Sequence, residues 1–308
     1  MRARGGLRRA PSTSTRGRES CARVSLAVCA VIASCAVIYP SAANAQGTYP
    51  PSIAQPSRAD SLLALGRLAA LEQTLYSAAD ARPRAPEPRG ALGAYLASRG
   101  RFRIAEILFQ EAQRFGANPR SVQRALAAMA PYRVRVGDGP EIAVAITVTS
   151  DATALFAFPV RAGRGEFMAL FDPSVRGVVL GRAAAAMIAQ RNGRLTLRID
   201  ARTLEGVEAS VDSTATPNEM RVGLDVLWGL HPQVDERASV LTLGRAPNPG
   251  AILGRVEQVP FVLTFPGMLL VPRVGSPPFA LESRAGRALL RGTRWQIDAA
   301  TATLMVER

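Results

Sequence analysis

The chain has 308 residues, a formal net charge of +14 and 48% hydrophobic residues. Every basic residue is arginine, and the arginines alternate with acids without the aromatic residues that stack nucleic-acid bases, so we expect no nucleic-acid partner. The cysteines are Cys21, Cys29 and Cys35, and His231 is the single histidine. The chain beyond residue 35 therefore has no disulfide, thiolate site or multi-histidine metal site, and we expect no metal and no cofactor.

The first 45 residues have the pattern of a secretory signal peptide. Residues 1–23 contain seven arginines and one glutamate, an apolar run follows at 24–38, and an Ala-x-Ala sequence ends at Ala45. We predict export to the periplasm or the extracellular space, with cleavage after Ala45. Two alternatives are an uncut membrane anchor formed by residues 24–38 and lipidation at Cys35. Membrane contact is expected only through such an uncut leader or lipid anchor.

A linker and a helical region follow the leader. Residues 46–57 are rich in proline, serine and glycine, which is typical of a flexible linker. Leucines at helical spacing predict a helix over 59–79, and three prolines in 81–89 end it. Two further helices are predicted within 91–119 and another over 121–130.

The pair of helices within 91–119 resembles a tetratricopeptide repeat. The residues that carry this resemblance are Leu92, Gly93, Leu96, Gly100, Ala105, Phe109 and Ala112. It implies a tetratricopeptide-like helical segment over 58–130, in which small residues let two antiparallel helices approach closely. Because such arrays need about three repeats to bury a continuous core, two roles stay open. The hairpin packs on the next domain, or it forms a peptide-binding groove.

From residue 131 onward the pattern changes to strands. The predicted elements are strands at 132–136, 141–149 and 153–160, a hairpin turn at 161–165, a strand at 167–171, a helix at 183–190, and a second hairpin of 195–199 and 207–211 that turns at 200–204.

Two stretches of this region, residues 158–180 and 221–243, together resemble the retropepsin-like aspartic peptidase lobe. The first reads as strand, turn, strand and then Asp172. The second begins with Val222 and Gly223, continues as a short helix and ends in a strand. The resemblance implies a mainly-β lobe over 131–245, with Asp172 as the catalytic residue and with Ser174 and Gly223 in the binding site.

A shorter copy of this lobe is predicted over 251–308. Gly223, Gly229, Asp235 and Leu241 recur 63 positions later as Gly286, Gly292, Asp298 and Leu304. Residues 268–275 are a loose partner of residues 168–175. The predicted fold class is therefore α+β, with a helical hairpin followed by an aspartic-peptidase-like β domain of two tandem lobes, the second shortened.

The peptidase motif is irregular in both copies. Aspartic peptidases need two carboxylates that share a proton and activate water. Pro173 and Ser174 stand where the family has a hydroxyl residue and glycine, and the second copy reads Val271-Pro272-Arg273 with no acid. An ordinary turn, in which Asp172 accepts nearby backbone N–H groups, is the favoured alternative to catalysis. Asp225 is interpreted as a helix-start or surface residue, and Asp235 and Asp298 as structural turn residues.

Three functional hypotheses remain from the sequence. The favoured one is an exported, catalytically degenerate aspartic-peptidase-like protein that binds a peptide or protein. The second is an active aspartic endopeptidase that pairs Asp172 with Asp172 in a homodimer. The third is an envelope scaffold that binds partners through its helical hairpin. The sequence leaves enzymatic activity open and favours its absence.

Overall fold

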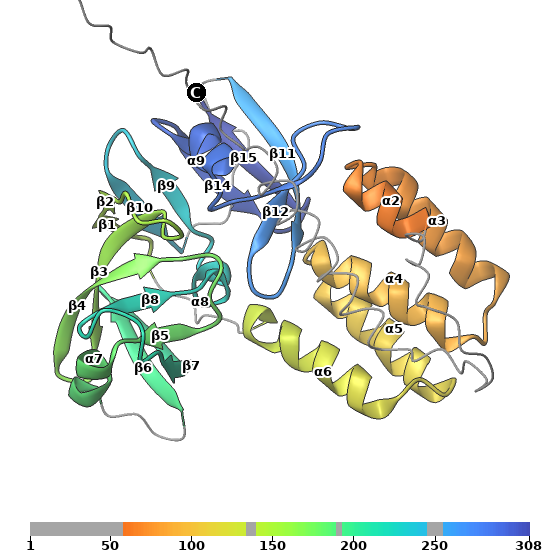
Figure 1. The fold of residues 1–308 in the computed structure, drawn as a ribbon, viewed down its shortest axis with the longest axis horizontal. Helices are drawn as coiled ribbons and strands as arrows, with labels where there is room; N and C mark the ends of the chain where they lie inside the picture. Colours follow the sequence, from red (N-terminus) through yellow and green to blue (C-terminus); the bar gives the residue numbers. More distant parts are fainter. Residues whose placement is uncertain (1–57, 134–139, 189–192, 245–254) are drawn as a thin grey trace, which may run out of the picture.

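A computed structural model gives the fold and describes residues 58–133, 140–188, 193–244 and 255–308. The predicted signal peptide over 1–45 and the predicted linker over 46–57 lie outside the described residues. The fold is α+β, because helices come first along the chain and a mainly-β region with two sheets follows. Figure 1 shows the first helices gathered on one side of the molecule and the sheets on the other. Within these ranges, no helix is both long and apolar enough to span a bilayer.

The helical region consists of α2 (Arg58–Ala64), α3 (Leu68–Ala81), α4 (Pro86–Ser98), α5 (Phe102–Arg114), α6 (Pro119–Met129) and the 3-10 turn η1 (Ala130–Arg133). The predicted helix over 59–79 is in fact two helices, because Gly66 between them has a φ of 62°. The Gly275 N–H donates to the Leu65 carbonyl over 2.8 Å and holds this break. Helix α4 begins at Pro86, inside the predicted break, because the first helical turn tolerates proline.

Small residues pack α4 closely against α5. A Cβ atom at Gly93 would lie 3.3 Å from the Leu108 Cβ, which is tighter than a usual contact. Ala105 and Phe109 of α5 are buried as well. The close approach of the two helices therefore depends on the small side chains that the sequence places there. The likeness to a tetratricopeptide repeat stays a prediction.

Six strands of the next region close into a barrel. Their order is β3 (Phe156–Ala162), β4 (Gly165–Phe171), β8 (Met220–Val222), β5 (Val178–Leu180), β7 (Arg202–Val211) and β6 (Arg194–Ile199), and β6 pairs back with β3. Strand β2 (Thr147–Val148) adds to β3, and the short helices α7 (Arg182–Met187) and α8 (Leu224–Trp228) follow β5 and β8. Alternating burial along β3, β4 and β6 directs the apolar side chains into the barrel.

The second sheet joins strands from both predicted copies. Its order is β1 (Ile142–Ala145), β10 (Val240–Leu243), β9 (Gln233–Asp235), β14 (Arg294–Asp298), β15 (Thr303–Glu307), β11 (Val256–Leu263), β12 (Met268–Leu270) and β13 (Phe279–Ala280). Helix α9 (Arg284–Leu290) lies between β13 and β14 in the sequence. The predicted strand over 141–149 is thus two strands in different sheets, β1 and β2, separated by the buried Ile146.

The strand register repeats with the displacement of 63 residues that the sequence predicts. Asp235 of β9 pairs with Val240 of β10, and Asp298 of β14 pairs with Thr303 of β15, 63 positions later in both strands. Asp235 and Asp298 each accept a backbone N–H within the following turn, at 2.9 Å. The two hairpins are therefore built alike.

The two hairpins meet at β9 and β14. Gln233 lies opposite Gln296, which is its own counterpart at the displacement of 63. Nε2 of Gln233 donates to the side-chain Oε1 of Gln296 over 2.6 Å. This pair consequently lies at the centre of the local twofold arrangement.

An aromatic cluster connects the helices to both sheets. Trp228 of α8 contacts Phe102 of α5, Tyr132 of η1 and Phe261 of β11, with ring centroids 5.5 to 6.1 Å apart. Phe265 lies at 5.3 Å from Tyr132 in the same cluster. Because these rings come from three parts of the chain, they tie the helical region and the β region into one core.

Candidate functional site

Two parallel strands bring Asp172 and Gly223 together, although they are about fifty residues apart in the sequence. Strand β4 ends at Phe171, which lies opposite Val222 at the end of β8. The Asp172 N–H then donates to the Val222 carbonyl over 3.0 Å. Strand β8 lies between β4 and β5 and runs parallel to β4 and antiparallel to β5. Because β4 and β8 are parallel, both strands end on the same side of the sheet.

The Asp172 carboxylate is buried and hydrogen-bonded through both of its oxygens. The residue is 1% exposed. Its Oδ1 accepts the Ser174 N–H at 3.0 Å and the Ser174 hydroxyl at 2.6 Å. Its Oδ2 accepts the Thr153 hydroxyl and Nη1 of Arg221, the latter at 2.8 Å. The turn that the sequence favours is therefore present, with the addition of a buried ion pair.

Arg221 is the centre of the surrounding charge cluster. Besides Asp172, its guanidinium contacts Asp151, with Nη2 to Oδ2 at 3.0 Å, and Glu219 through Nε. Burial by itself lowers the pKa of Arg221, but the hydrogen bonds that Arg221 donates to the carboxylates of Asp151, Asp172 and Glu219 outweigh it and raise the pKa. For the acidic Asp151, burial alone would raise the pKa. The hydrogen bonds from Arg221 and from the Ala154 and Thr153 N–H groups outweigh burial, so the pKa of Asp151 is lowered. Arg221 and Asp151 therefore stay ionised at neutral pH.

A further carboxyl group, Glu282, approaches from the C-terminal part of the chain. Burial raises the pKa of Glu282, and the charge of Asp172 raises it further. The described residues provide no hydrogen bond between the two carboxyl groups and none to the Oε2 atom of Glu282. Nearby, Arg287 of α9 donates to the Ala154 carbonyl over 2.8 Å and so holds α9 against the loop that contains Thr153.

Gly223 allows the loop after Asp172 to pack against the start of α8. A Cβ atom at Gly223 would lie 2.4 Å from the Val175 carbonyl oxygen and 2.5 Å from Oδ1 of Asp225. Asp225 lies in the first turn of α8, as the sequence suggests, but it is 4% exposed rather than a surface residue. Its two carboxylate oxygens both accept the Gly177 N–H at 3.0 Å. Burial raises the pKa of Asp225.

The corresponding part of the second copy is built differently. Strand β12 pairs antiparallel with β13, whereas β4 pairs parallel with β8. The segment after β12 begins with Val271 and packs against the break between α2 and α3, where a Cβ atom at Gly66 would lie 2.7 Å from the Val271 Cγ1. Pro272 and Arg273 follow, so no acid stands at this position.

The three candidate residues from the sequence, Asp172, Ser174 and Gly223, do lie together. Arg221, Asp151 and Glu282, which lie around Asp172, were not among the residues predicted from the sequence. One signal was available, because Arg221 interrupts the otherwise apolar strand 220–222, and a charge inside a buried strand indicates a buried partner.

Comparison with known proteins adds little to this geometry. No family model and no curated protein matches the chain. Among solved structures, a retropepsin-like aspartic protease from Rickettsia conorii is similar over 34% of this chain and 88% of its own, with 13% sequence identity and a TM-score of 0.27. A score this low does not establish a shared fold.

Proposed function

We propose that this chain is a retropepsin-like protein that does not cleave peptides and instead binds a peptide or protein partner. The main support is that both carboxylate oxygens of Asp172 already accept hydrogen bonds from the side chains of Arg221, Thr153 and Ser174. An aspartic peptidase must leave its carboxylates free to share a proton and hold a water molecule. The guanidinium of Arg221 bonds to Oδ2 of Asp172 and takes a lone pair that a catalytic water would need.

The repeated register supports an architecture of two tandem lobes, 131–245 and 251–308. The second lobe is the shorter one, and it supplies Pro272 and Arg273 where a second catalytic acid would be needed. Strands β9 and β14 of the two copies pair with each other around a local twofold axis within one chain. The second copy therefore takes the place that the second subunit would have in a symmetric dimer. This arrangement weighs against the homodimeric peptidase.

We also propose that the protein is exported, because residues 1–45 combine an arginine-rich start, an apolar run and an Ala-x-Ala sequence. The helical segment 58–130 would then support the β region through contacts such as the hydrogen bond from Arg99 to the Phe261 carbonyl.

A cleavage assay tests the proposal. The purified chain is incubated with a mixture of casein-derived peptides between pH 3 and pH 7, and the products are followed by mass spectrometry. We expect no new termini with the native chain, and the same result with the Asp172→Asn variant. Cleavage by the native chain that disappears in Asp172→Asn would overturn the proposal.

An active peptidase is the second candidate, and the proximity of Glu282 favours it. Two carboxyl groups close enough for one charge to act on the other are the arrangement that aspartic catalysis requires. The same assay with Glu282→Gln decides this case. If cleavage occurs and is lost in both Asp172→Asn and Glu282→Gln, the chain is a peptidase with an unusual Asp–Glu pair.

A further inference from the structure

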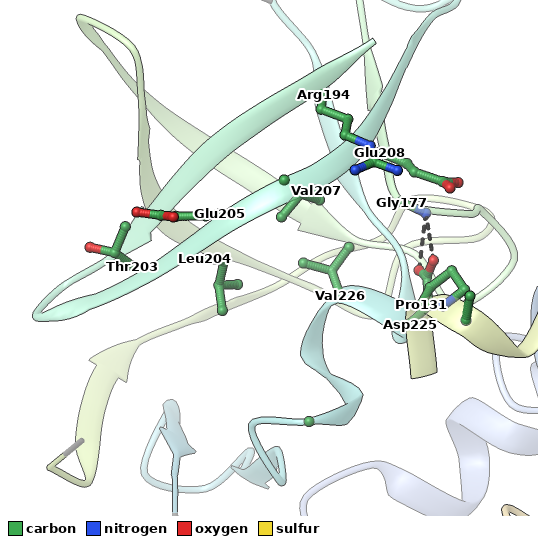
Figure 2. Close-up of a pocket in the computed structure, with 13 residues that line it drawn as sticks. Pro131, Gly177, Arg194, Thr203, Leu204, Glu205, Val207, Glu208, Asp225 and Val226 are labelled. Carbon is green, nitrogen blue, oxygen red and sulfur yellow. Dashed lines mark hydrogen bonds between the residues drawn. The ribbon is translucent and has the colours of Figure 1, made fainter. Parts of the chain in front are cut away.

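A pocket of about 440 Å³ lies between β7, α8 and η1. Leu204 and Val207 of β7, Val226 of α8 and Pro131 of η1 contribute apolar side chains to it. Figure 2 shows Leu204 and Val207 on the side of β7 that faces Val226. The pocket thus has an apolar floor, and its volume is in the range of known ligand sites. Asp172 is not among its lining residues.

A β-bulge in β7 builds this floor. The register between β6 and β7 shifts between Leu195 and Leu197, so residues 205–206 of β7 stand opposite a single residue of β6. In a regular strand, residues three positions apart point to opposite faces. The extra residue of the bulge turns Leu204 and Val207 to the same face, and bulges often re-aim side chains in this way beside functional sites.

The pocket also lies along an open part of the β7 edge. Strand β5 pairs with residues 209–211 of β7, on the side away from β6. Among the described residues, no strand continues this pairing along residues 203–207. Gly177, immediately before β5, lines the pocket, so the opening lies next to the N-terminal end of β5. An extended segment in line with β5 would continue the sheet over five residues, or about 17 Å.

The charges at the pocket favour a cationic occupant. Asp225, Glu205 and Glu208 line it, against Arg194 alone, and Glu208 is already paired with Arg176 at 3.0 Å. Asp225 is 4% exposed, and within the described part of the chain it forms no ion pair. The charge of Arg176 acts on Asp225, but Arg176 is bonded to Glu208, so a ligand that pairs its own positive charge directly with Asp225 gains affinity there.

We propose that this pocket binds an extended peptide segment as an added strand on β7, with alternate apolar side chains on the floor and an arginine or lysine directed to Asp225. The inference rests on the proposed function and gives the binding module a specific site. Main-chain hydrogen bonds to residues 203–207 would provide affinity, and the floor and Asp225 would provide selectivity.

A second hollow of about 600 Å³ beside β1, β3 and β4 is larger, but it fits this role less well. Its charged residues include Arg161 and Glu166, which pair with each other and are 63% and 70% exposed. Strand β1, which lines this hollow, is an edge strand as well, so the two hollows differ in their charges rather than in having an open strand edge. The hollow therefore serves as the matched control, and Met168, which lines it and is 55% exposed, is its test position.

The test uses the purified full-length chain and two fluorescein-labelled heptapeptides, read by fluorescence anisotropy. Both peptides alternate valine and threonine, and the central residue is arginine in one and glutamate in the other. We expect the arginine peptide to bind at least about tenfold more tightly than the glutamate peptide. Val226→Trp, which fills the pocket, should weaken binding about tenfold or more, and Met168→Trp should not. Asp225→Asn should abolish the preference for arginine.

Each other outcome contradicts the inference in a distinct way. Binding that is lost in Met168→Trp and kept in Val226→Trp places the peptide in the other hollow, so the binding module stands and the site is wrong. No binding of either peptide to the native chain also overturns the site, while the cleavage assay decides the proposed function independently. If Val226→Trp does not fold, the exposed substitution Glu205→Arg replaces it, and an unchanged preference for arginine there would also overturn the inference.

Discussion

Asp151 bonds to Arg221 and Asp225 bonds to the Gly177 N–H, and the surroundings of the two residues shift their pKa values in opposite directions. Burial acts to raise both. For Asp151, hydrogen bonds from Arg221 and two backbone N–H groups outweigh it, so the pKa is lowered. For Asp225 burial dominates, and the pKa is raised. The two residues should therefore make opposite contributions to the pH dependence of stability.

We predict that Asp151→Asn reduces the loss of unfolding free energy on acidification. The unfolded pKa of aspartate is about 3.9, and the folded pKa of Asp151 is lower. Its stabilisation is present above about pH 4 and is lost as the pH falls through the folded pKa. Asp225 has the opposite sign, because its raised pKa makes the folded state less stable as the pH rises from about 4.

Urea unfolding between pH 2.5 and pH 7 measures both effects. Compared with the native chain, Asp151→Asn should lose less unfolding free energy as the pH falls below about 4, and Asp225→Asn should lose less, or gain more, as the pH rises above about 4. Curves that run parallel to the native curve over the whole range would show that neither carboxyl group has the surroundings described here.

Single residues were predictable from the sequence where the signal is local. Asp172, Ser174 and Gly223 follow apolar strands at recognisable positions, and the bond from Ser174 to Asp172 spans only two residues. Arg221 and Asp151 meet across seventy positions. Such a contact depends on the pairing of β4 with β8, which a short-range pattern does not determine.

At the scale of elements, the loop after β4 and the start of α8 fit together only because glycine stands at position 223. A Cβ atom there would meet the Val175 carbonyl oxygen at 2.4 Å. The same device recurs at Gly286 in α9, where a Cβ atom would lie 2.1 Å from the Leu281 carbonyl oxygen. Both obstacles are backbone atoms, which cannot move aside as a flexible side chain can.

We predict that Gly223→Ala lowers the unfolding free energy by about 1–3 kcal/mol, because the methyl group forces the two segments apart. Gly93→Ala is the matched control. Its Cβ atom would meet Leu108 at 3.3 Å, and the gain in helix propensity, about 1 kcal/mol, offsets the crowding. Chemical denaturation of both variants measures the difference. An equal effect of the two substitutions would contradict the packing described for Gly223.

Elements with strong local patterns were predicted well. The hairpin of β3 and β4 turns at Gly163, which has a φ of 59°, within the predicted turn over 161–165. The bulge at residues 205–206 was not predicted, and β7 begins at Arg202 rather than at Val207. The break at Gly66 was missed for a similar reason, because it depends on contact with the segment after β12.

At the scale of the whole molecule, the parts are joined by the β9–β14 pairing and by the aromatic cluster around Trp228. The sequence revealed the repeat with its displacement of 63 residues, because glycine and aspartate recur in both hairpins. It did not reveal that the two hairpins would form one sheet through Gln233 and Gln296. Contacts between distant parts depend on the complete fold rather than on any single segment.

We predict that the described molecule unfolds in one cooperative transition. Trp228 reports on the first β region and Trp295 on the second, and both are buried. Trp228→Phe leaves Trp295 as the reporter, and Trp295→Phe leaves Trp228. In each variant, the urea midpoint from fluorescence should coincide with the midpoint from far-UV circular dichroism. Separate midpoints would show that the two regions unfold independently.

A double-mutant cycle of Asp172→Asn and Arg221→Met tests most directly whether Asp172 serves as a structural partner of Arg221. Removing Arg221 leaves a buried carboxylate uncompensated, so each single change should lower the unfolding free energy, and the coupling energy should be about 1–3 kcal/mol. A carboxylate kept for catalysis is commonly held at a cost in stability. Additive effects, with Asp172→Asn neutral or stabilising, would contradict the account.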